Sequence, residues 1–140
     1  MHMTLEADYA VRIVEFLAVH PERVDAKTIS EKTNVTQRFT LKILRTLVAD
    51  GIVCSYKGAK GGYKLAKPAK EITLRRVIEA VEGPYMISRC QGDSYSCHRT
   101  DCRLHGIYAE VSAMVRSKLD SYTFDSICSC DEGEEAEKSE

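Results

Sequence analysis

The sequence predicts a mainly helical chain with one small β-hairpin, arranged as a winged helix-turn-helix and followed by a long C-terminal dimerisation helix. Apolar residues recur at helical spacing in three successive segments between residues 5 and 50. A glycine-rich, basic hairpin pattern follows over 52–65, and an amphipathic stripe begins at Leu104. Three helices followed by a basic hairpin is the element order of a winged helix-turn-helix, whose third helix enters the major groove of DNA.

The first two helices of this predicted domain have recognisable ends. Apolar side chains at steps of three and four residues predict a helix over 6–19, and Pro21 follows its end. Asp25 is the expected N-cap of a second helix over 26–33. Asn34 then suits a left-handed turn, because its short polar side chain tolerates that backbone conformation.

The third predicted helix has an N-cap at Thr36 and runs to about residue 49, where Asp50 and Gly51 end it. Its apolar positions are Phe39, Ile43, Leu44, Leu47 and Val48. The positions assigned to the opposite face are Gln37, Arg38, Thr40, Lys42 and Arg45. That second set contains no acid, whereas an exposed helix usually mixes its charges. We therefore expect this face to meet a polyanion.

The hairpin that follows has a basic tip. Residues 52–56 and 63–65 read as its two strands, and the turn between them contains Lys57 and Lys60 among glycines. A fourth short helix is expected over 73–80.

The long helix that begins at Leu104 is expected to pair with its own copy, because a single small domain has little surface to cover its apolar stripe. A homodimer would also match the repeated half-sites of an operator. The predicted segments are a DNA-binding domain over 1–82, a cysteine-rich cluster-binding loop over 83–103, the dimerisation helix and end segment over 104–127, and an acidic, disordered tail over 128–140.

Charge is unevenly distributed along the 140 residues, although the formal net charge is only −1. Residues 31–70 hold nine Lys or Arg against two acids, whereas 131–140 hold six acids against one Lys. A basic segment inside a folded pattern favours nucleic acid, here double-stranded operator DNA, as the partner. No apolar run is long enough for a membrane span, and the first residues lack a signal-peptide pattern, so a cytoplasmic location is expected.

The residues expected to contact DNA lie on the third helix and the hairpin tip. Gln37 and Arg38 are the expected base readers, whereas most of the other cations are expected to contact phosphates. The complete predicted set is Thr36, Gln37, Arg38, Thr40, Lys42, Arg45, Lys57 and Lys60.

Three cysteines and a histidine lie close together in a polar stretch that has no apolar pattern of its own. They are Cys90, Cys97, Cys102 and His105. Thiolates bind soft metals, so this spacing indicates an iron-sulfur cluster, a zinc ion held by three cysteines and one histidine, or reversible thiol chemistry without a metal. Nothing in the chain resembles a phosphate-binding loop or a catalytic pocket, so an enzyme is not expected.

The hairpin over 57–63 and the run Arg89-Cys90-Gln91-Gly92, with Cys97 and Cys102 after it, resemble the IscR and NsrR family of iron-sulfur transcription regulators. The resemblance covers roughly residues 3–127. It implies a dimeric winged-helix regulator, expected here to be a repressor, whose cluster senses redox state, nitric oxide or iron-sulfur status and alters operator affinity. The alternative is a zinc-stabilised or thiol-redox regulator without a cluster.

The same resemblance leaves two fourth ligands open. In the IscR pattern a histidine follows the third cysteine after two intervening residues, which here is His105, and the cluster is of the 2Fe-2S type. In the NsrR pattern an aspartate of the first helix comes from the other subunit, which here is Asp8, and the cluster is of the 4Fe-4S type. We favour Asp8, because His105 begins the dimerisation helix and can serve there as an ordinary polar side chain.

The three remaining cysteines are not assigned to the metal site. Cys54 is expected to be a buried or half-buried side chain in the hairpin. For Cys128 and Cys130, just before the acidic end, the alternatives are an auxiliary redox pair, a metal-trapping arm or an unstructured segment, and we favour the last.

Overall fold

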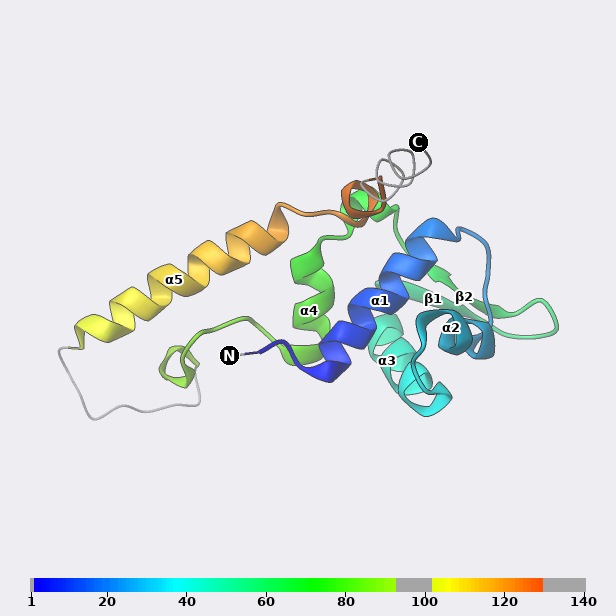
Figure 1. Ribbon diagram of the computed structural model, residues 1–140, viewed down its shortest axis with the longest axis horizontal. Coiled ribbons are helices and arrows are strands. Elements are labelled where there is room, and N and C mark those ends of the chain that lie inside the picture. Colours follow the sequence, from blue (N-terminus) through cyan, green and yellow to red (C-terminus); the bar gives the residue numbers. More distant parts are fainter. Residues whose placement is uncertain (1, 93–101, 130–140) are drawn as a thin grey trace, which may run out of the picture.

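The computed structural model describes residues 2–92 and 102–129 (Figure 1). Helices dominate, and the two strands form one antiparallel hairpin, so the predicted fold class is confirmed. The elements in chain order are α1 (Leu5–Val19), α2 (Ala26–Thr33), α3 (Gln37–Ala49), β1 (Val53–Tyr56), β2 (Gly62–Leu65), η1 (Ala69–Glu71), α4 (Leu74–Glu82), η2 (Arg89–Gln91) and α5 (Arg103–Asp120).

Side-chain caps explain why four of these helices begin where they do. Thr4, Asp25, Thr36 and Thr73 each precede a helix and accept a hydrogen bond from a backbone N–H of its first turn. At Asp25, hydrogen bonds from the Thr28 hydroxyl and then from its backbone N–H lower the pKa of the carboxyl. The predicted caps at Asp25 and Thr36 are therefore confirmed.

Helix α1 is the centre of the core, and it packs against α2, α3 and α4. Its buried residues meet apolar side chains from the other helices and from the hairpin. The largest fully buried side chains in the described part include Ile13, Leu17, Ile29, Ile43, Leu44, Leu47, Ile52, Ile72 and Phe124. This core holds α3 at the surface, with one face inward and one face free.

The hairpin is the wing, and backbone contacts fasten it to the body. Cys54 pairs with Lys64 across the two strands. Two hydrogen bonds of 2.9 and 2.8 Å then join the backbones of Val24 and Tyr63. Gly62 permits this close approach, because a Cβ there would lie 2.8 Å from the Val24 carbonyl oxygen and its φ is 146°. The wing is therefore tied to the segment that precedes α2.

The segment after α5 returns to the core, although no local pattern in the sequence indicates this. The Leu74 N–H donates to the Tyr122 carbonyl oxygen at 2.9 Å, and the Phe124 N–H donates to that of Ile72 at 3.1 Å. Phe124 is 0% exposed. Residues 124–129 are helical, so the expectation of an unstructured chain from residue 128 is wrong for Cys128 and Ser129. Cys130 and the acidic end lie outside the described residues.

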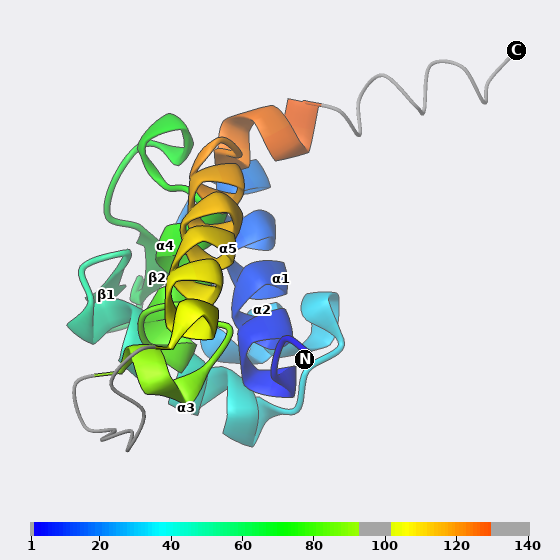
Figure 2. The same ribbon diagram turned by 90° about the vertical axis from the view of Figure 1, so that its left-hand side faces the viewer.

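Helix α5 projects from the body, and its C-terminal end lies beside α4 (Figure 1). In the view turned by 90°, α5 projects toward the viewer in front of the body, with α4 behind it (Figure 2). Ser112 is the one residue of α5 that is fully buried. Leu104, Ile107 and Met114 are 43%, 50% and 66% exposed. Across residues 2–92 and 102–129, no helix combines the length and apolarity needed to cross a membrane.

Candidate functional site

One residue predicted for the exposed face of α3 is buried instead. Gln37, Arg38, Lys42 and Arg45 are exposed, as expected. Thr40 is 0% exposed, so its predicted place on this face is wrong. Thr40 precedes Ile43, Leu44 and Leu47 by three, four and seven residues, and at this spacing it shares their inward face. Its hydroxyl has no hydrogen-bond partner in the described part of the chain.

Leu41 occupies the exposed face instead, and its side chain is 39% exposed. It follows Gln37 by one turn and precedes Arg45 by one turn. A surface hollow of about 580 Å³ beside it is lined by Arg38, Phe39, Leu41, Lys42 and Arg45. Phe39, expected inward, is 36% exposed and tilts against Tyr9 with ring centroids 5.9 Å apart.

The cations of α3 are not equivalent. Lys42 Nζ lies 2.6 Å from Glu6 Oε1 of α1, so this predicted phosphate contact already has a carboxylate partner. Both side chains are more than a third exposed, and such a pair contributes only about 0–1 kcal/mol. Within the described residues, Arg38 and Arg45 form no ion pair. These two arginines are therefore the cations of α3 most available to DNA.

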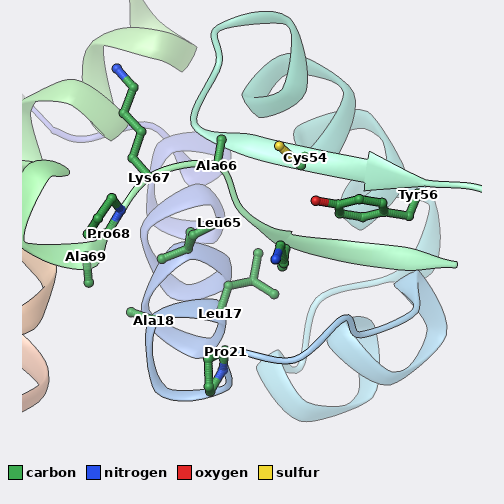
Figure 3. Close-up of a pocket in the computed structure, with 11 residues that line it drawn as sticks. Leu17, Ala18, Pro21, Cys54, Tyr56, Leu65, Ala66, Lys67, Pro68 and Ala69 are labelled. Carbon is green, nitrogen blue, oxygen red and sulfur yellow. The ribbon is translucent and has the colours of Figure 1, made fainter. Parts of the chain in front are cut away.

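The wing presents further cations near its tip. Lys57 and Lys60 are both exposed in the turn between the strands. At the end of β1 next to this turn, the guanidinium carbon of Arg23 lies 3.7 Å from the centroid of the Tyr56 ring. Figure 3 shows Cys54 beside a hollow of about 460 Å³ between the wing and α1. Cys54 is half-buried, as expected, and its thiol is free.

Two of the three predicted cysteine ligands lie in the described part of the chain. Cys90 lies in η2, and Cys102 immediately precedes α5. Both thiols are free and half-buried, and the Ser88 hydroxyl donates to Cys90 Sγ at 3.2 Å. Cys97 falls outside the described residues. Two free thiols at the two ends of one segment are the donor type that an iron-sulfur cluster or zinc requires, so these residues fit such a group.

The two candidate fourth ligands lie on different helices of this chain. Asp8 Oδ2 in α1 lies 2.9 Å from Arg12 Nη2, and the Asp8 side chain is 35% exposed. His105 is exposed in the first turn of α5. Among residues 2–92 and 102–129, no three His, Cys, Asp or Glu side chains come together as a metal site.

A part-buried hydrogen-bond network centred on the buried Ser112 attaches the segment that carries Cys90 to α5. The Ser112 hydroxyl accepts from the Ile87 N–H at 2.9 Å and donates to Gln91 Oε1 at 2.7 Å. One turn later on the helix, Arg116 Nη1 donates to the Tyr85 carbonyl oxygen at 2.6 Å. Cys90 is next to Gln91, so this network positions the first cysteine against the long helix.

The same segment is linked to α4 through an acid shared by two donors. Glu79 Oε1 accepts from the Tyr85 N–H and from Arg75 Nε, each at 3.1 Å. Arg75 also donates to Asp120 Oδ2 at 2.7 Å. The hydrogen bonds to Asp120 and then to Glu79 raise the pKa of the Arg75 guanidinium. The cysteine segment, α4 and α5 therefore share one set of polar contacts.

We expect Ser112→Ala to destabilise the protein by about 1–2 kcal/mol, because the part-buried Ile87 N–H would lose its acceptor. The measurement is urea unfolding, together with hydrogen exchange at the Ile87 amide. Ser117→Ala, at an exposed position of the same helix, is the matched control. Unchanged exchange at Ile87 would contradict the anchoring role of Ser112.

Comparison with known proteins identifies the family of the chain. The model of the Rrf2 family, described as an iron-dependent transcriptional regulator, matches residues 3–129. The chain belongs to the Rrf2 family. It is therefore a DNA-binding transcriptional regulator.

Individual Rrf2 relatives agree over most of the chain. The HTH-type transcriptional regulator IscR of Pectobacterium atrosepticum is 32% identical over 130 residues, which cover 91% of this chain and 79% of that protein. Among solved structures, IscR of T. potens has a TM-score of 0.75 at 22% identity and covers 97% of this chain and 90% of its own. CymR, the global cysteine regulator of B. subtilis, has a TM-score of 0.77 at 22% identity. The match covers 92% of this chain and 97% of the CymR chain. At that identity, the two structures show a shared winged-helix fold alone.

Sequence reasoning missed two residues of this Rrf2 chain that shape its candidate sites. Leu41 could have been found from its spacing, because it is the apolar residue one turn from both Gln37 and Arg45. Ser112 had no comparable signal, because a serine within an amphipathic helix reads as an ordinary polar position. Its burial depends on a segment more than 20 residues earlier in the chain.

Proposed function

We propose that this Rrf2-family regulator is a homodimeric repressor whose operator affinity depends on the state of a site built from Cys90, Cys97 and Cys102. The observation that carries the proposal is the attachment of both described cysteines to α5. Cys102 is the residue before the helix begins, and Cys90 is held to it through Gln91 and Ser112. A change at the thiols would therefore alter the position of α5 and, through Arg75 and Glu79, that of α4.

The proposed occupant is an iron-sulfur cluster, because three closely spaced cysteines suit it and the chain is similar to IscR proteins. When bound, such a cluster supplies a centre that responds to redox state, nitric oxide and iron-sulfur supply. The chain's own residues bind it through thiolates and hold those thiolates relative to α5. To transmit the state of the cluster to DNA, the dimer would need two geometries that differ in DNA affinity. The cluster would shift the population between them only if it binds one geometry more tightly than the other.

Anaerobic purification tests the occupant. We expect brown protein that absorbs visible light and contains iron and acid-labile sulfide. Cys90→Ser and Cys102→Ser should each reduce the bound iron at least about tenfold, whereas Cys54→Ser should leave it unchanged, because Cys54 lies in the wing. Colourless protein with one zinc per chain would refute the cluster and support the zinc-stabilised alternative. Gel-shift titrations of holo and apo protein with equal affinities would refute the sensing role.

The fourth ligand is proposed to be Asp8 of the other subunit, with His105 as the alternative. Asp8 would have to share its carboxylate with Arg12 or exchange that partner for the metal. Asp8→Ala and His105→Ala separate the two ligands, because the variant that removes the true ligand should change the visible spectrum of the cluster. If neither variant changes it, both assignments are wrong.

A second candidate function is thiol-based sensing without a metal. It is favoured by the free state of the Cys90 and Cys102 thiols and by the similarity to CymR, one of whose Staphylococcus aureus structures is of an oxidised form. Metal-free protein whose DNA affinity changes reversibly with oxidant and reductant, and no longer does so in Cys90→Ser, would favour this function over the cluster.

Dimerisation through α5 is proposed because its exposed stripe lacks a partner in the described part of the chain. Ile107 and Met114 are two turns apart on one face, and both are at least half exposed. We expect Ile107→Glu to weaken self-association at least about tenfold, since it would bury a charge at an apolar interface. Sedimentation velocity over a range of concentrations measures this effect. Ala109→Glu, on the opposite face of α5, is the control, and equal effects of the two variants would exclude this stripe as the interface.

A further inference from the structure

We infer that Leu41 reads a thymine through its C5-methyl group, and this inference rests on the proposal that α3 faces the operator. Leu41 is an apolar residue in the middle of an otherwise polar and cationic surface. At 100° per residue it lies about 40° around the helix axis from both Gln37 and Arg45. It is 39% exposed, whereas the neighbouring Ile43 and Leu44 are 2% and 0% exposed. It is therefore not a residue of the core.

The surroundings of Leu41 would place it against the floor of a groove rather than against the DNA backbone. Arg38, Lys42 and Arg45 line the same hollow as Leu41, and Arg38 and Arg45 lie about one turn before it and one turn after it along the helix. Cations at the edges suit phosphates, and the centre of such a surface suits the bases. With DNA in place, Leu41 would be removed from water between these cations.

The chemistry of the base edges indicates which base Leu41 would contact. In the major groove each base pair presents hydrogen-bond donors and acceptors, and the apolar group presented there is the C5-methyl of thymine. Leucine can satisfy no donor or acceptor, so contact with a G·C pair would leave polar atoms dehydrated without a partner. Contact with the thymine methyl buries apolar surface on both sides. Leu41 should therefore specify T at one position of each half-site.

Replacing single thymines by uracil tests this inference, because that change removes the methyl group and leaves the hydrogen-bonding edges unchanged. A preferred site is first selected from a randomised duplex library with the full-length protein. Each thymine is then replaced in turn, and affinity is measured at fixed salt. We expect one position per half-site at which uracil weakens binding about fourfold, as expected for one buried methyl group.

Two variants separate the role of Leu41 from a general effect on binding. Leu41→Ala should abolish the methyl dependence at that position, and its exposed site and the helix propensity of alanine should preserve the fold. Lys42→Ala, at the neighbouring exposed position, should keep the methyl dependence and change affinity by a similar factor for every duplex. Methyl dependence that persists in Leu41→Ala, or its absence at every thymine of the selected site, would overturn the inference. Failure to select any preferred site would instead refute sequence-specific binding and, with it, the role of Leu41.

Discussion

Reversing the charges of Arg38 and Lys57 together is expected to weaken operator binding on the order of a hundredfold. Arg38 lies on the exposed face of α3, and Lys57 lies in the turn of the wing. Each would exchange an attractive contact with a base or phosphate for repulsion from the DNA. A lost contact of this kind typically costs about 1–3 kcal/mol, and the two residues lie on different elements, so their effects should nearly add.

The salt dependence of binding distinguishes loss of these contacts from misfolding. In Arg38→Glu/Lys57→Glu, the slope of log affinity against log salt should become less steep by about one to two, because fewer phosphates are neutralised. Lys70→Glu/Lys118→Glu carries the same change in net charge at exposed positions in η1 and α5. This control should retain most of the affinity. Equal losses in both double variants would show that overall charge, rather than α3 and the wing, determines binding.

Phe124→Ala is expected to reduce the free energy of unfolding by about 3–5 kcal/mol, which is the usual loss for a fully buried phenylalanine. Phe124 is 0% exposed, and its N–H donates to the Ile72 carbonyl oxygen just before α4. The side chain therefore belongs to the core of the DNA-binding domain, although it follows α5 in the chain. Its removal would leave a cavity among residues from several elements.

Urea unfolding monitored by circular dichroism measures this loss, at one protein concentration because association also stabilises the chain. Tyr122→Ala is the matched control, since Tyr122 is an aromatic residue of the same segment but is 43% exposed. We expect this control to change stability by less than about 1 kcal/mol. A loss equally small for Phe124→Ala would show that the segment after α5 does not complete the core.

Local patterns predicted the elements of the DNA-binding domain well. The Asp25 and Thr36 caps, the left-handed Asn34 and the boundaries of α2 depend on neighbours within a few residues, and the structure has them as expected. Periodicity also placed the apolar side of α1, whose buried residues include Ile13 and Leu17. Such features can be predicted from the sequence, because the contacts that create them join residues close together in the chain.

The candidate sites were predicted less completely. On α3 the assignment of Thr40 to the exposed face was wrong. It was based on the polarity of threonine, whereas the helical spacing places Thr40 on the buried face with Ile43 and Leu47. The ion pair between Lys42 and Glu6 joins residues 36 positions apart, so no local pattern revealed it. In the cysteine segment, residue types indicated metal ligands, but their attachment to α5 depends on Ser112.

The sequence by itself determined the helices, the wing, the basic character of α3 and its surroundings, and the cysteine donors, because each follows from residue type and short-range spacing. Tertiary structure decided that Lys42 pairs with Glu6, that Phe124 returns to the core, and that Cys90 is anchored to α5. These features depend on contacts between segments far apart in the chain. Such contacts form only when the packed core brings those segments together.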